Sequence, residues 1–85
     1  MRKVYTSNFT VLCRESQAEG SRIGIVTTKK VGNAVRRNRV RRLIREFFRL
    51  NREKIKRSED LVVIVRPGTR IDRYVDVERE LEALL

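Results

Sequence analysis

The pattern of hydrophobic and polar positions divides the chain into predicted strands and helices. Residues 9–13 are apolar and β-branched, and residues 22–28 alternate between two faces, so both are predicted strands, with a short strand at residues 4–6 before them. The polar residues 15–21 are typical of a turn, and we expect an antiparallel hairpin across it. Residues 61–65 are five apolar residues in a row, which indicates a strand covered on both faces.

Two helices are predicted between and after these strands. Asn33 is a candidate N-cap for a helix that continues to about Asn51, and Asp72 is expected to cap a last helix. The long helix has an apolar stripe of Val40, Leu43, Ile44, Phe47 and Leu50, with Phe48 at its edge. A helix between strands usually joins a parallel pair, so we expect one α+β domain over residues 1–85, with a small mixed sheet and helices packed on it.

Charge changes this picture because it is concentrated in one block. Residues 29–57 carry 13 Lys or Arg and two acidic residues, a net charge of +11, whereas the other 56 residues carry a net charge of −1. A concentrated basic block is typical of a protein that binds a polyanion. The polar side of the long helix consists of Asn38, Arg41, Arg42, Arg45, Arg49 and Arg52.

The arginine spacing on this helix disfavours a purely solvated surface. Arg41, Arg45 and Arg49 are four residues apart, and like charges at that spacing destabilise a helix. Arginine also binds phosphate through two parallel hydrogen bonds and stacks on bases. A membrane-surface helix is disfavoured because its apolar stripe is needed for the sheet. A helix-turn-helix is disfavoured because a strand follows. The residues themselves do not separate RNA from DNA.

Few residues offer protein-based catalysis. The chain has no histidine, and Cys13, its single cysteine, lies in an apolar strand and is expected to be a buried thiol. Asp72 and Asp76 are expected to cap and be solvated rather than to hold a metal. Tyr5 and Tyr74 are expected to be half-buried packing residues. No signal peptide or apolar run of membrane-spanning length is visible, which indicates a cytoplasmic protein without a membrane partner.

The central segment resembles a known family. Residues 22–46, RIGIVTTKKVGNAVRRNRVRRLIRE, are similar to the signature of the protein subunit of bacterial ribonuclease P, which is R-x-G, a strand, and K-K-x-G-N-A-V-x-R-N-R-x-[KR]-R-x-x-R-E. Residues 60–67 resemble the strand that follows in that family. The resemblance covers roughly Phe9 to the C-terminus, and the last helix matches by pattern alone.

The resemblance implies a subunit of an RNA-catalysed enzyme. In that family an RNA with Mg²⁺ hydrolyses the bond that releases the 5′ leader from precursor tRNA, and the protein breaks no bond. The implied partners are the catalytic RNA and precursor tRNA, and no residue of this chain is expected to be catalytic or metal-binding. The family fold also implies a left-handed strand–helix–strand crossover, against the general right-handed rule. The alternatives are a small RNA-binding ribosomal or assembly protein and a protein-only nuclease.

The resemblance also assigns residues by matching positions. The Arg37-Asn38-Arg39 segment is expected to contact the catalytic RNA, and a cleft between the sheet and the basic helix is expected to hold the single-stranded leader. The residues expected to bind RNA are Lys29, Lys30, Asn33, Arg36, Arg37, Asn38, Arg39, Arg42 and Arg49. The residues expected in the leader cleft are Phe9, Val11, Thr27, Arg41 and Arg45, and for Phe9 a place in the core is equally expected.

Two features depart from the family pattern. Relatives begin with a further helix whose aromatic residues help to line the leader cleft, and this chain starts at about the first strand, so we expect that helix to be missing and the cleft to be half-built. Leu12 stands where relatives can carry a base-stacking tyrosine. Such stacking is worth about 1–3 kcal/mol per base, so leader affinity is expected to be affected more than binding to the catalytic RNA.

Overall fold

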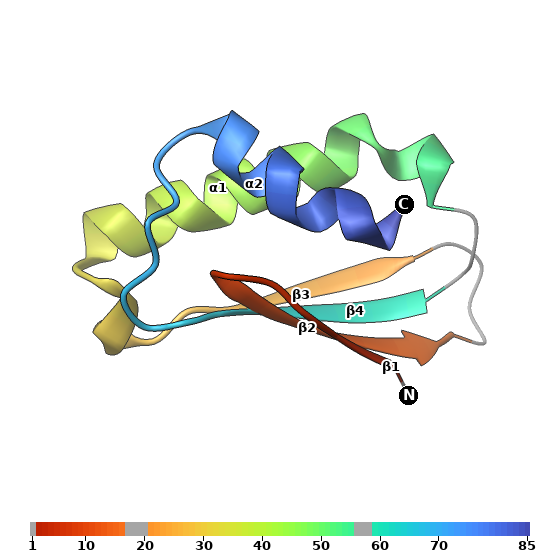
Figure 1. Cartoon of the computed structure of the whole chain (residues 1–85), viewed down its shortest axis with the longest axis horizontal. Coiled ribbons are helices and arrows are strands. Elements are labelled where there is room, and N and C mark those ends of the chain that lie inside the picture. Colours follow the sequence, from red (N-terminus) through yellow and green to blue (C-terminus); the bar gives the residue numbers. More distant parts are fainter. Residues whose placement is uncertain (1, 17–20, 56–58) are drawn as a thin grey trace.

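The fold is a mixed sheet with both α-helices on one of its faces. The computed structural model describes residues 2–16, 21–55 and 59–85, and in these residues four strands form one sheet (Figure 1). The strands are β1 (Arg2–Tyr5), β2 (Phe9–Glu15), β3 (Arg22–Val26) and β4 (Glu59–Val65). The helices are α1 (Ala34–Leu50) and α2 (Tyr74–Leu81), with short 3₁₀ turns η1 (Lys29–Val31), η2 (Arg52–Lys54) and η3 (Glu82–Leu84).

The order of the strands differs from the expected hairpin. It is β1-β2-β4-β3, so β4 lies between β2 and β3, and the prediction that those two strands pair directly is wrong. The hairpin is instead β1–β2, where Thr6 accepts a hydrogen bond from the Phe9 backbone at 3.0 Å. The expected parallel pair is confirmed, because β3 and β4, which precede and follow α1 in the sequence, run parallel to each other. Residues 17–20 of the predicted turn lie outside the described residues.

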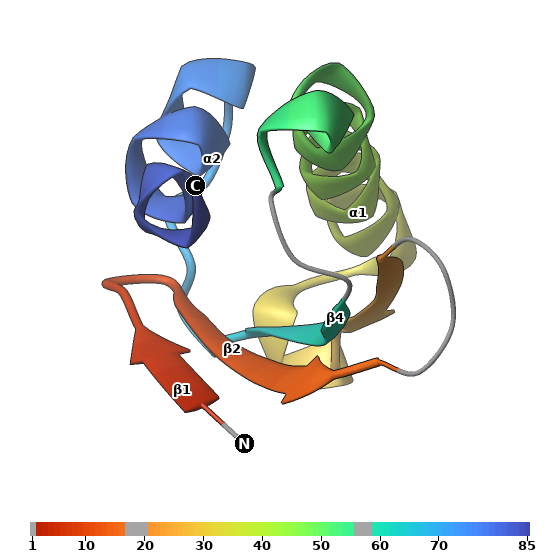
Figure 2. The ribbon, with the colours of Figure 1, turned by 90° about the vertical axis from the view of Figure 1, so that its right-hand side faces the viewer.

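The helices cover only one face of the sheet. Seen along the strands, α1 lies over the β4–β3 side and α2 over the β1–β2 side (Figure 2). In β4 the side chains of Leu61, Val63 and Val65 are buried, whereas Val62 and Ile64 on the other face are only half-buried. The prediction that residues 61–65 are covered on both faces is therefore wrong. This strand is apolar throughout because it is central in the sheet, not because it lies between two layers.

The core joins the covered sheet face to α1 and α2. Its residues are Phe9, Val11, Cys13, Val31, Val40, Ile44, Phe47, Phe48, Leu61, Val63, Val65, Ile71, Val77 and Leu81. The expected apolar stripe of α1 is confirmed at Val40, Ile44 and Phe47, but Leu50 is 55% exposed because it lies at the last residue of the helix. Cys13 is buried, as expected for a packing thiol.

The ends of the helices follow local chemistry. Asn33 caps α1 as predicted, because its Oδ1 accepts the Arg36 backbone N–H at 2.9 Å, and Asn51 at the other end donates to the Phe47 carbonyl at 2.8 Å. The prediction that Asp72 caps α2 is wrong. The Asp76 carboxylate does so from the first turn, where it accepts the backbone N–H groups of Asp72 and Arg73 at 3.0 and 2.9 Å. These hydrogen bonds lower the pKa of Asp76.

Asn8 ties together three segments that are distant in sequence. Its backbone N–H and Nδ2 donate to the two carboxylate oxygens of Glu80 on α2 at 2.7 and 2.6 Å. Its carbonyl and Oδ1 accept the backbone N–H groups of Arg66 and Arg70 at 2.9 and 3.0 Å. The β1–β2 turn, the C-terminal helix and the segment after β4 are therefore fixed relative to one another. That segment, residues 66–73, is called the β4–α2 loop below.

Candidate nucleic-acid interface

The long helix turns a row of arginines away from the core. Its apolar stripe packs on the sheet, so the residues about half a turn away face outward. Five of them line a shallow hollow together with Glu46, and we call this surface the arginine face; its members are Asn38, Arg41, Arg42, Arg45 and Arg49. Four guanidinium groups against one carboxylate leave the arginine face strongly positive.

The one carboxylate on the arginine face is already used. Glu46 forms an ion pair with Arg49 one turn along the helix, and the hydrogen bond from Arg49 lowers the pKa of Glu46. Glu46 therefore remains ionised at neutral pH and offsets one charge. Arg41, Arg42 and Arg45 form no ion pair with any described residue, so these three charges remain for a partner.

The side chain of Arg41 costs folding stability. Its Nε is buried and has no hydrogen-bond partner within the described part of the chain. A buried donor without a partner costs folding free energy, and an apolar side chain in its place would avoid that cost. The position therefore fits a side chain held for contact with a ligand.

Two arginines at the start of α1 contact the backbone of the β4–α2 loop. Arg36 donates to the carbonyls of Thr69 and Ile71 at 3.2 and 2.8 Å. Arg39 donates twice to the Asp72 carbonyl, at 3.0 and 2.7 Å, and both guanidinium groups lie within 4 Å of the Asp72 carboxylate. Two residues that the sequence assigned to RNA contact thus also hold this loop against the helix. Arg37, between them in the sequence, has no such contact and is half-buried.

The segment before α1 is shaped by Gly32. Its φ of 150° is one that residues with a side chain rarely adopt, and a Cβ there would lie 3.0 Å from Cγ of Arg36. This geometry lets η1 carry exposed Lys29 and Lys30 to the beginning of the helix. The expected RNA-binding lysines and the N-capping Asn33 are therefore close to Arg36 and Arg37 in space as well as in sequence.

Replacing Gly32 with alanine is expected to destabilise the fold by about 1–3 kcal/mol, because of the backbone conformation and the collision with Arg36. Thermal unfolding of the purified protein measures this. Gly68→Ala is the matched control, because Gly68 also has a positive φ, 75°, but a Cβ there meets no atom within 4 Å. A loss for Gly32→Ala no greater than that for Gly68→Ala would show that the Arg36 contact contributes nothing.

The residues expected in the leader cleft do not come together. Phe9 and Val11 are 0% exposed and lie in the core beneath the helices, so they do not line an open cleft. Arg41 and Arg45 lie on the arginine face, and Thr27 is half-buried just after β3. The physical reason is strand phase. Phe9, Val11 and Cys13 point toward the helices and are buried in the core, which leaves their neighbours to face the other way.

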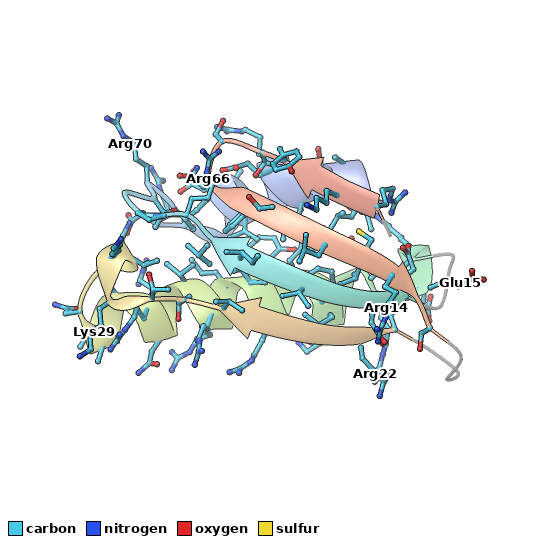
Figure 3. All side chains as sticks on the ribbon, turned by 90° about the horizontal axis from the view of Figure 1, so that it is seen from below. Arg14, Glu15, Arg22, Lys29, Arg66 and Arg70 are labelled. Carbon is cyan, nitrogen blue, oxygen red and sulfur yellow. The ribbon has the colours of Figure 1, made fainter. Side chains whose placement is uncertain are left out.

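Those neighbours belong to the sheet face that the helices leave uncovered (Figure 3). Strand pairing arranges this open sheet face in rows across all four strands. One row is Tyr5, Thr10, Ile64 and Val26, and the next is Lys3, Leu12, Val62 and Gly24. The middle of the open sheet face therefore carries the apolar side chains Leu12, Val62, Ile64 and Val26. Tyr5, expected to be half-buried, is instead 67% exposed, and Val26 is 42% exposed.

The two ends of the open sheet face differ in charge. At one end Asp60 pairs with Arg14 at 3.2 Å and with Arg22 at 2.9 Å, so one carboxylate offsets one of the two arginine charges there. The hydrogen bonds from Arg22, and then from Arg14, lower the pKa of Asp60. Arg66, Arg70 and Lys29 lie at the opposite end (Figure 3). Of these three, none has an ion pair with a described residue.

Sequence reasoning missed the open sheet face and its basic end. Strand alternation contained the signal for the face, since Thr10, Leu12, Val62 and Ile64 are out of phase with the buried positions. Charge patterning gave no signal for Arg66 and Arg70, because they lie outside the charge block and are isolated from it in sequence.

Among the residues that the structure describes, no three His, Cys, Asp or Glu side chains are placed to hold a metal ion. In that part of the chain, no helix has the length and apolar character needed to cross a membrane.

Comparison with known proteins agrees with this architecture. The model of the family described as Ribonuclease P matches residues 1–85. The ribonuclease P protein component of Syntrophus aciditrophicus is 48% identical over 84 residues, which are 99% of this chain and 71% of the relative. That of Dictyoglomus turgidum is 45% identical over 80 residues, 94% of this chain and 66% of the relative.

Solved structures extend the agreement to the fold. The RNase P protein from Thermotoga maritima superposes with a TM-score of 0.87 at 37% identity, over 99% of this chain and 80% of that one. The RNase P protein from Staphylococcus aureus superposes with a TM-score of 0.82 at 30% identity, over 98% of this chain and 76% of that one. With its family signature, its fold and its sequence all in agreement, this chain belongs to the bacterial ribonuclease P protein components, which take part in tRNA processing.

Proposed function

We propose that this protein binds the catalytic RNA of ribonuclease P through η1 and α1 and holds the 5′ leader of precursor tRNA on its open sheet face. The observation that carries the first part is the arginine face, where Arg41, Arg42 and Arg45 have no carboxylate partner among the described residues. Phosphates of a folded RNA supply the missing negative charge. The chemistry of leader removal belongs to the RNA and its Mg²⁺, and the protein lowers the Mg²⁺ concentration that two RNAs need to approach each other.

The start of α1 adds directional contacts to this charge. Lys29 and Lys30 are exposed in η1 just before the helix, exposed Asn38 follows the half-buried Arg37, and the free N–H groups of the first helical turn favour an anion. Arg36 and Arg39 contribute mainly by holding the β4–α2 loop, so Arg37 is the residue of the Arg-Asn-Arg segment whose side chain is most available to RNA.

The open sheet face suits a single strand better than a duplex. Proteins recognise single-stranded RNA by placing splayed bases on apolar and aromatic side chains, and phosphates beside basic groups. Leu12, Val62 and Ile64 give such a floor, and Tyr5 and Lys3 on β1 border it. Leader binding on this face replaces the expectation of a cleft between the sheet and α1, because packed side chains fill that space.

Tyr5→Ala is expected to weaken binding of precursor tRNA by the holoenzyme about fivefold to a hundredfold, the equivalent of losing about one stacked base. Tyr5→Phe keeps the ring and is expected to retain affinity. Tyr74→Phe serves as a control, because Tyr74 begins α2 on the covered side of the sheet and packs against the core. Equal affinities for the Ala and Phe variants at position 5 would mean that no base stacks there.

The proposed function is tested by cleavage of precursor tRNA with a bacterial ribonuclease P RNA at low Mg²⁺, with and without this chain. Correct 5′ cleavage that depends on the chain supports both halves of the proposal. Binding to the catalytic RNA without restored cleavage would confine the function to RNA binding and contradict the leader half. Neither binding nor activation would contradict both.

Arg37→Ala separates a ribonuclease P subunit from a general RNA-binding protein. It is preferred to Arg39→Ala, because loss of Arg39 also releases the Asp72 carbonyl and disturbs the loop. We expect Arg37→Ala to weaken binding to ribonuclease P RNA while binding to an unrelated RNA duplex changes little. An equal loss on both RNAs is the result expected of a ribosomal or assembly protein.

A further inference from the structure

One pair of residues on the arginine face does not fit a surface that only attracts phosphates. Glu46 is the one acidic residue of α1, and it lies in the hollow among four arginines. Its carboxylate repels the phosphates that the neighbouring guanidinium groups attract. An exposed ion pair at its spacing from Arg49 stabilises a helix only slightly. The presence of Glu46 on this face therefore has a weak explanation in helix stability alone.

The ion pair fixes the orientation of the Arg49 guanidinium group. Nε of Arg49 donates to Oε2 of Glu46 at 3.1 Å, and Nη2 donates to Oε1. Two parallel hydrogen bonds between a guanidinium fork and a carboxylate define the geometry of both groups. The Arg49 side chain is nevertheless 68% exposed. Arg49 is thus set in place before a ligand arrives, which reduces the entropy lost on binding.

The paired guanidinium group offers a ligand a flat face rather than a free charge. The edge formed by Nε and Nη2 is occupied by Glu46, and the carboxylate offsets the positive charge of Arg49. A phosphate therefore gains less at Arg49 than at Arg42 or Arg45, which have no ion pair with a described residue. The plane of a guanidinium group is a surface on which unpaired RNA bases stack.

An exposed apolar side chain lies at the same end of the helix. At about 100° per residue, Glu46 lies between Arg49 and Leu50 on the helix surface. Leu50 is the last residue of α1 and is 55% exposed. Planar and apolar side chains favour a nucleobase, whereas neither favours a phosphate. The C-terminal end of the arginine face therefore differs in chemistry from its middle.

We propose that Arg49, positioned by Glu46, is a stacking platform for an unpaired base of the catalytic RNA. This inference rests on the proposed binding of that RNA to α1. Phosphates lie along Arg42 and Arg45, and one base that is not paired within the RNA lies on the guanidinium plane of Arg49, beside Leu50. Such a contact makes binding selective, because a fully paired duplex has no free base to place there.

The test uses variants that leave the net charge of the protein unchanged. Glu46→Ala/Arg49→Ala removes the pair, Arg49→Lys keeps the charge but not the plane, and Arg42→Lys is the matched control at an unpaired arginine. Filter binding over a salt series measures affinity for ribonuclease P RNA and for a fully paired RNA duplex. For the first two variants we expect affinity for ribonuclease P RNA to fall about fivefold, the low end of the loss for one stacked base, with an unchanged log–log salt slope.

The duplex and the control separate stacking from other causes. The two variants of the pair are expected to bind the duplex as the parent protein does, and Arg42→Lys is expected to retain its affinity for both RNAs. An unchanged affinity of Glu46→Ala/Arg49→Ala for ribonuclease P RNA would overturn the inference. Equal losses on the duplex, or an equal loss for Arg42→Lys, would also overturn it.

Glu46→Gln tests the positioning role of the carboxylate. This variant adds one net positive charge, so affinity for the duplex is expected to rise, but the ratio of affinities for ribonuclease P RNA over the duplex is expected to fall. A parental ratio would contradict the positioning role, since a purely electrostatic effect acts on both RNAs. All these failures leave the proposed function intact. If the parent protein does not bind ribonuclease P RNA, the RNA-binding half of that function fails, and this inference fails with it.

Discussion

Phe47→Ala is expected to destabilise the protein by about 3–5 kcal/mol. Phe47 is fully buried between α1 and the sheet, and its ring contacts Phe48 edge-on with centroids 5.3 Å apart. A domain of 85 residues has a total stability on the order of 5–10 kcal/mol, so this one change removes much of it. Urea unfolding followed by circular dichroism measures the loss from the midpoint and the slope.

The control is Leu50→Ala in the same helix. Leu50 is also apolar, but it is 55% exposed, and its loss is expected to cost less than about 0.5 kcal/mol. Similar midpoints for the two variants would contradict the assignment of the α1 stripe. Catalytic RNA binds only the folded state in the proposed function, so its addition is expected to raise the midpoint of Phe47→Ala by mass action.

Arg42→Ala/Arg45→Ala is expected to cause the largest loss of binding to the catalytic RNA. Both residues are exposed on the arginine face without an ion pair to any described residue. Two lost contacts to duplex phosphates should lower the log–log salt slope by about 1.8 and the affinity at physiological salt by about tenfold or more. Filter binding with ribonuclease P RNA over a salt series gives both quantities.

Stability provides the internal check on this result. Alanine has the highest helix propensity, and its introduction removes like charges four residues apart, so the double variant should be as stable as the parent protein or slightly more stable. Arg14→Ala/Arg22→Ala removes the same charge from the ion-paired end of the sheet and is expected to keep the parental slope. Identical slopes for the two double variants would show that net charge alone governs binding.

The helices were predictable because their signals are local. The cap at Asn33, the stripe through Ile44 and the end near Asn51 all depend on residues within one or two turns. The arginine face was predictable for the same reason, since a 17-residue helix with one buried stripe must expose the residues opposite it. The family signature fell on this same segment.

The sheet was less predictable because its pairing is not local. Nothing between Glu15 and Arg22 shows that β4, more than 30 residues later, will be inserted between the strands on either side of them. Once α1 covers one face, the phase of every strand is set, and Phe9 and Val11 become core residues whereas Leu12 faces outward. Arg66 and Arg70 join the basic surface only through Asn8 and Arg36, contacts that span 33 to 62 residues.

The central place of β4 sets an order of events during synthesis. β2 and β3 leave the ribosome before β4 and have no common neighbour until residues 59–65 have been made. Until then α1 has no complete sheet on which to bury Ile44 and Phe47, although all its arginines have been synthesised. Folding must therefore wait for the last third of the chain, and the nascent protein presents its positive charge to RNA before it has its final shape.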